Sequence, residues 1–90
     1  ELYNIQKLVN QYNAYLWNLK RLDKSIMEEF LHKFSDTFKE FYIKKEIKTE
    51  FFKSVRKRDF LLLINSPYKF YEKVVNKNIF YFFKGAKYEN

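Results

Sequence analysis

Glycine and proline are almost absent from this chain, and their scarcity constrains the fold more than any motif does. The 90 residues contain one Gly and one Pro. Tight hairpin turns and phosphate-binding loops need glycine, because its backbone adopts positive φ angles at little steric cost. A β-rich fold with many short turns therefore has no support in the sequence, and we expect helices.

The spacing of apolar residues predicts two long helices. The first stripe recurs at three- and four-residue steps between residues 2 and 21, and the second does so between residues 25 and 44. Such steps place side chains on one face of an α-helix. The first stripe comprises Leu2, Ile5, Val9, Tyr12, Leu16 and Leu19; the second comprises Ile26, Phe30, Phe34, Phe38 and Phe41. Ser25 and Glu28 have the spacing of a capping box, which would start the second helix.

Two further helices are expected in the second half of the chain. Thr49 is a candidate N-cap for a helix that ends near Asn65. Its inward face would comprise Phe51, Phe52, Val55, Leu62 and Leu63. Ser66-Pro67 predicts a new helix start. Proline has no backbone N–H, and in the first turn of a helix that N–H would have no intrahelical partner anyway. We expect this last helix to run to about residue 77.

Four helices with short connections predict one all-α domain over residues 1–90, a compact four-helix bundle with an aromatic-rich core. The C-terminal segment IFYFF, residues 79–83, is apolar on every side. It either folds over the bundle as a last piece of core or stays partly exposed as an interaction surface.

The composition also limits the cellular context. There is no Cys, so neither disulfides nor thiolate metal sites are expected, and a reducing, intracellular compartment fits. No apolar run approaches the roughly 18 residues of a membrane helix. The chain begins at Glu1 and its only Met is Met27, so we expect a piece of a larger protein.

Catalysis and metal binding have little support. Glu28, His32 and Asp36 fall at four-residue steps and would share one side of the second helix. Charged residues with this spacing are ordinary on a solvated helix face, and no second His completes a ligand set. The lone His also has no Ser or Cys partner in a nucleophile motif. We therefore expect no enzyme activity, no metal and no cofactor.

Positive charge gathers in the second half. Residues 1–47 hold eight Lys or Arg against seven Asp or Glu, whereas residues 48–90 hold ten against four, out of a net charge of +7. Such cations could contact phosphates of a nucleic acid, with an affinity that falls as salt rises. The alternatives are a solvated lysine face and codon bias from an AT-rich genome. The candidate phosphate-binding residues are Lys53, Arg56, Lys57, Lys69, Lys73 and Lys77.

Trp17 lies off the apolar stripe of the first helix, on the side of Tyr3 and Arg21. A Trp with aromatic and Arg neighbours has the composition of an interface hot spot. The alternative is that another helix of the bundle covers it. The predicted partner-binding residues are Tyr3, Trp17, Arg21, Phe80, Phe82 and Phe83.

Three segments in order, YLWNLK (15–20), SIMEEF (25–30) and KFYEKVVNKNI (69–79), give the chain a family resemblance. It resembles the Apetala2-coincident C-terminal domain of apicomplexan transcription factors, an all-helical accessory module. The resemblance implies a nuclear regulatory protein in which this domain contacts other proteins while a separate domain reads DNA. It implies no catalytic residues.

The sequence thus predicts a non-enzymatic protein–protein interaction module, and the resemblance implies an accessory domain of a nuclear transcription regulator. Two alternatives stay open: a basic helical module that binds nucleic acid, and a structural oligomerisation domain. Their salt dependence and self-association distinguish them.

Overall fold

The computed structural model describes residues 2–75, with side chains from residue 4 onward. Its elements are α1 (Leu2–Leu19), α2 (Lys24–Ile43), the 3₁₀-helix η1 (Thr49–Lys53), α3 (Lys57–Asn65), α4 (Pro67–Phe70) and the π-helix η2 (Tyr71–Val75). No strand occurs in this part of the chain. The all-α prediction is therefore confirmed, whereas the apolar segment 79–83 lies outside the described residues.

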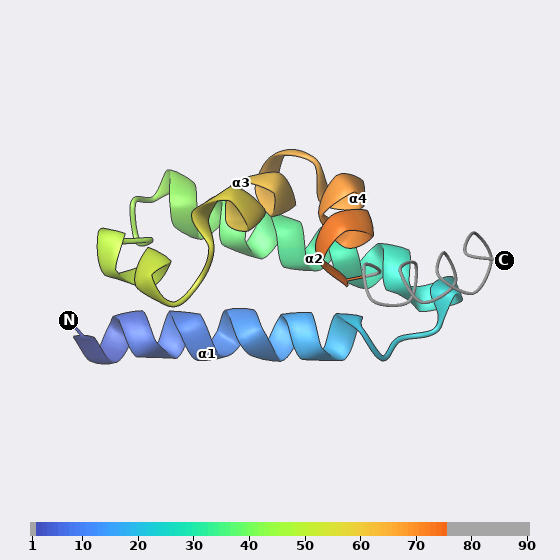
Figure 1. Cartoon of the computed structure of the whole chain (residues 1–90), viewed down its shortest axis with the longest axis horizontal. Coiled ribbons are helices and arrows are strands. Elements are labelled where there is room, and N and C mark those ends of the chain that lie inside the picture. The colour runs from blue at the N-terminus through green and yellow to red at the C-terminus, as the bar shows by residue number, and fades with distance from the viewer. Residues whose placement is uncertain (1, 76–90) are drawn as a thin grey trace, which may run out of the picture.

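The helices pack around α2. Figure 1 shows α1 along one side, α2 running back antiparallel to it, and η1, α3 and α4 returning along α2. Helix α2 contacts α1, α3 and α4, and η1 closes back onto α1. Within residues 2–75, the helices are too short or too polar for any of them to cross a bilayer.

The core is built from aromatic rings, as the sequence predicts. Its fully buried side chains are Phe34, Phe38, Phe51, Phe60, Phe70, Leu19, Leu31 and Leu63. The buried ring of Tyr12 lies at the centre, with centroid distances of 5.3 Å to Phe34 and 5.5 Å to Phe38. Phe51 and Phe60 complete the contacts at 6.0 and 6.2 Å. One α1 side chain therefore joins α2, η1 and α3.

The predicted capping box at the start of α2 is wrong. The N-cap is Asp23, whose carbonyl accepts hydrogen bonds from the N–H groups of Ile26 and Met27. Ser25 therefore already lies inside the first turn, where its hydroxyl is not a cap. No side chain caps this helix.

The prediction of one continuous helix from residue 49 to residue 65 is also wrong. Residues 54–56 interrupt the helix, and the backbone is extended at Arg56, with φ −64° and ψ 120°. Phe51 and Phe60 are nine residues apart, so a continuous helix would place them on opposite faces. The break brings their ring centroids to 5.5 Å, inside the same core.

The helix start at Pro67 is confirmed, with Ser66 as N-cap and Pro67 in the first turn. Within α3, the natural partner of the Leu63 carbonyl would be the N–H of residue 67, which proline lacks. The buried Ser35 hydroxyl of α2 donates to that carbonyl instead, at 2.8 Å. A side chain of α2 thereby supplies the hydrogen-bond donor that the Leu63 carbonyl lacks at the junction of α3 and α4.

Candidate functional site

Trp17 is an exposed aromatic side chain on the outer side of α1. It follows the buried Tyr12 by five residues, which turns it about 140° around the helix from the core. Its side chain is 60% exposed. Within the described part of the chain no helix covers it, so the prediction of an off-stripe, surface Trp is confirmed.

Arg21 is held next to Trp17. Its guanidinium carbon lies 5.6 Å from the centroid of the indole ring, a cation–π distance. Its backbone N–H donates to the Asn18 carbonyl at 3.0 Å, which positions the Arg21 backbone in the turn after α1. The structure therefore brings together two of the predicted partner-binding residues, and we call this pair the Trp17 surface.

The remaining predicted partner-binding residues are less informative. Tyr3 lies in the first turn of α1, but its side chain falls outside the described part. Phe80, Phe82 and Phe83 lie beyond residue 75 and are also outside it. Of the six predicted partner-binding residues, the structure therefore describes the side chains of Trp17 and Arg21 only.

The predicted phosphate-binding cations are exposed, and they fall into two groups. The first group comprises Lys53, Arg56 and Lys57 around the break before α3. The second group comprises Lys69 in α4 and Lys73 in η2. Lys77 lies outside the described residues. Within residues 4–75 these five side chains make no ion pair, although the Lys57 ammonium lies 5.5 Å from the Phe52 ring centroid.

The proposed row of Lys69, Lys73 and Lys77 assumed α-helical geometry. The backbone changes to π-type turns at Tyr71, where hydrogen bonds link residues five apart rather than four. Lys69 and Lys73 therefore lie on either side of the change from α-type to π-type turns, and the third member of the row, Lys77, lies outside the described residues.

Glu28 and His32 of α2 contact Tyr68 of α4. The Tyr68 hydroxyl donates to the Glu28 carboxylate and lies 3.1 Å from His32 Nε2. The Glu28 hydrogen bond, followed by partial desolvation, raises the pKa of Tyr68. Asp36 takes no part in this contact. Among the described residues, no three His, Asp or Glu side chains gather in a way that could bind a metal ion.

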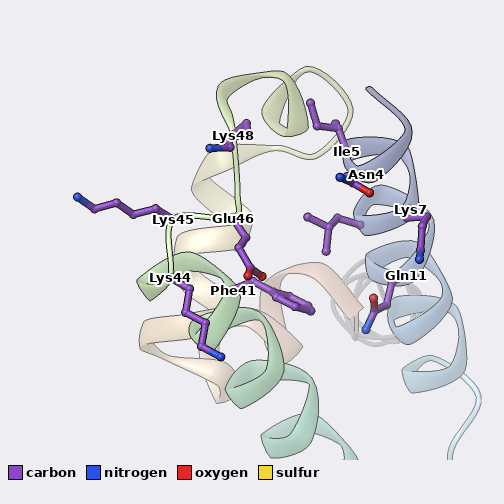
Figure 2. A pocket seen from close by; sticks show the side chains of 10 residues that line it. Asn4, Ile5, Lys7, Gln11, Phe41, Lys44, Lys45, Glu46 and Lys48 are labelled. Atoms are coloured by element: carbon purple, nitrogen blue, oxygen red, sulfur yellow. The ribbon is translucent and has the colours of Figure 1, made fainter. Parts of the chain in front are cut away.

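The sequence did not predict a cleft of about 590 Å³ between the first half of α1 and the end of α2 (Figure 2). Its apolar floor is formed by Ile5 and Leu8 of α1 and Phe41 of α2. Asn4 and Gln11 line the α1 side. This volume lies within the range of ligand-binding clefts.

Lysines form much of the rim of this cleft, on the loop that follows α2. Lys45 N–H donates to the Tyr42 carbonyl and Glu46 N–H to the Phe41 carbonyl. This is the Schellman pattern, whose left-handed position is usually glycine. Here it is Lys45, with φ 61°. The charged run KKEIK, residues 44–48, was the one sign of this rim in the sequence. It does not indicate which residues of α1 lie across the cleft from it.

Comparisons of the chain with protein family models, with curated proteins and with solved structures found no match. What defines the chain is therefore its own structure. It is a small all-α domain with an aromatic core, the Trp17 surface on one side of α1 and a lysine-rimmed cleft at the beginning of that helix.

Proposed function

We propose that this chain is a non-enzymatic protein–protein interaction module that binds its partner through the Trp17 surface. The observation that carries the proposal is the exposed indole of Trp17 with the Arg21 guanidinium over it. Trp and Arg are the residues most enriched among interface hot spots. The aromatic core is complete without Trp17, so packing within the described domain does not account for a Trp at this position.

The family resemblance supports a more specific role. An Apetala2-coincident domain would act as an accessory module of a nuclear transcription regulator of an apicomplexan. In that role the domain recruits another protein, while a separate domain of the parent protein reads DNA. Its location would then be nuclear, and the Trp17 surface would be the recruitment site.

The test compares two variants that each remove a large exposed apolar side chain. Trp17→Ala removes the proposed hot spot, and Ile43→Ala is the matched control, because Ile43 is 66% exposed and lies outside the Trp17 surface. Immobilised domains are incubated with an apicomplexan nuclear extract, and retained proteins are quantified by mass spectrometry. Truncating a hot-spot residue costs at least about 2 kcal/mol, or about 30-fold in affinity.

We expect the proteins retained by the wild-type domain to be lost with Trp17→Ala and kept with Ile43→Ala. Retention should also persist at high salt, because an aromatic hot spot depends little on screening. A retained set that is the same for all three domains would contradict the proposal. Trp17 is the only Trp in the chain, so its fluorescence gives a second readout: an indole shielded from iodide in the isolated domain would also contradict it.

A second candidate function is nucleic-acid binding. It is supported by the five exposed cations that have no carboxylate partner among the described residues: Lys53, Arg56, Lys57, Lys69 and Lys73. A labelled mixed-sequence DNA and RNA pool should then bind with a Kd of about 10⁻⁴–10⁻⁶ M, and binding should collapse as salt rises. No binding at low salt would remove this candidate. Self-association detected by light scattering would instead favour the oligomerisation domain.

A further inference from the structure

We propose that the cleft between α1 and the end of α2 binds a partner segment that carries large apolar residues flanked by carboxylates. This site is separate from the Trp17 surface and the proposal does not rest on it. Leu8 in the cleft and Trp17 are nine residues apart, which places them on opposite sides of α1. The two sites can therefore be tested independently.

The floor of the cleft suits an apolar anchor. Leu8 and Phe41 are only partly buried, and Ile5 closes the floor between them and the core. The Phe41 ring packs edge-on against the fully buried Phe38 at a centroid distance of 5.3 Å, so the core supports this part of the floor. The α1 side spans residues 4–11, about 10 Å of helix, which matches two turns of a bound amphipathic helix.

The rim determines the charge of the partner. Lys44 is already paired with Glu40, with a distance of 2.8 Å between its ammonium nitrogen and the carboxylate oxygen. Lys45 and Lys48 have no carboxylate partner within residues 4–75. These two ammonium groups, on flexible four-carbon stems, are available to carboxylates that flank an apolar anchor.

Two residues of the loop after α2, Lys45 and Glu46, indicate where the carboxylates of the partner would lie. Lys45 occupies a left-handed position that favours glycine, so helix termination does not explain the lysine there. Glu46 is the one acidic residue lining the cleft, and Figure 2 shows it pointing toward the cleft while Lys45 points away. Glu46 repels carboxylates from the floor, so the acidic residues of the partner must lie over the outer rim.

The probe is a fluorescein-labelled peptide of twelve residues with two large apolar residues four positions apart and glutamates beside them. Binding is followed by fluorescence polarisation. We expect Lys45→Gly and Lys48→Gln to weaken it about three-fold each, as for exposed ion pairs. Glu46→Gln should strengthen it about two-fold, and Lys33→Gln, an exposed charge on the middle of α2, should change it by less than about 1.5-fold.

These variants separate binding from folding. Glycine adopts the left-handed backbone conformation at little steric cost, so Lys45→Gly should raise the melting temperature of the domain. The same variant should lower the affinity for the peptide. Trp17→Ala should leave peptide binding unchanged, so a failure of the proposed function does not affect this test. Peptides with glutamines for glutamates, or serines for the apolar residues, should each bind at least about ten-fold more weakly.

Three results would overturn the proposal. The first is equal peptide affinity for the wild type and the Lys45→Gly, Lys48→Gln double variant. The second is displacement of the peptide by a mixed-sequence oligonucleotide with a dependence on Lys45, which would make the cleft a phosphate site. The third is a dimer that the double variant dissolves, which would make the occupant a second copy of this chain.

Discussion

Ser35 is a single polar residue inside the apolar side of α2, and its role is visible only in three dimensions. It lies next to Phe34 in the sequence and is buried. Periodicity alone gives no reason for a Ser there. The reason is Pro67, which leaves the Leu63 carbonyl without its usual N–H donor, so the Ser35 hydroxyl takes that place.

Ser35→Ala should therefore destabilise the domain by about 1–3 kcal/mol, because a buried carbonyl loses its donor. Ser25→Ala is the matched control on the same helix. Ser25 is exposed and lies inside the first turn rather than at the N-cap, so alanine there should be neutral or slightly stabilising. Urea unfolding of both variants measures the difference. Equal midpoints for the two variants would contradict the assigned role of Ser35.

At the scale of the elements, α3 begins with an unfavourable arrangement of charge. Its N-cap is Arg56, Lys57 and Arg58 follow in the first turn, and Asp59 is the one acidic residue in that turn. The N-terminus of a helix carries partial positive charge, so cations destabilise it, whereas Asp or Ser caps it. No side chain caps this helix. Helix stability therefore does not explain the three cations, which is consistent with a role at the surface.

Arg56→Asp should stabilise the domain by about 0.5–2 kcal/mol, since it adds a cap and removes a cation from the helix start. The control is Lys53→Asp at the end of η1, where a cation is favourable and its reversal should be neutral or destabilising. Thermal and urea unfolding measure both. A destabilised Arg56→Asp variant would mean that Arg56 makes a structural contact. If the domain binds nucleic acid, both variants should weaken that binding.

The two long helices were predictable from the sequence because each has one apolar stripe with a regular period. The break between η1 and α3 was not, since the segment from Phe51 to Leu63 contains apolar residues on all sides. A pattern of that kind is compatible with several registers. The choice is made by Tyr12 on α1, which packs against both Phe51 and Phe60 and so requires the backbone to turn between them.

At the scale of the whole molecule, the two candidate sites differ in how far the sequence predicts them. The Trp17 surface comprises the end of α1 and the turn after it, and the position of Trp17 follows from its spacing relative to Tyr12. The cleft combines residues 4–11 with residues 41–48, which come together only after α1 and α2 pack antiparallel. A local pattern carries no information about that pairing, and the charged run KKEIK by itself resembles any solvated loop.

Tyr12 joins α1 to α2, η1 and α3, so its ionisation should affect the stability of the domain at alkaline pH. Burial, and secondarily the charge of Asp59, raise the pKa of the Tyr12 hydroxyl well above its ordinary value of about 10. In the unfolded chain Tyr12 ionises at that ordinary value. A group whose folded pKa is raised contributes stability that is complete below the unfolded pKa and is lost as the pH rises above it.

The free energy of unfolding of the wild type should therefore fall above pH 10, with Tyr12 contributing up to about 1.4 kcal/mol per pH unit. Tyr12→Phe keeps the ring but removes the ionisable group, so its stability should fall less steeply over the same range. Urea unfolding at intervals between pH 7 and pH 11.5 gives both curves. Tyr42→Phe is the control, because the Tyr42 side chain is 40% exposed. Parallel curves for the wild type and Tyr12→Phe would show that the hydroxyl ionises as readily in the folded domain as in the unfolded chain, which a phenol buried among Phe34, Phe38 and Phe51 should not do.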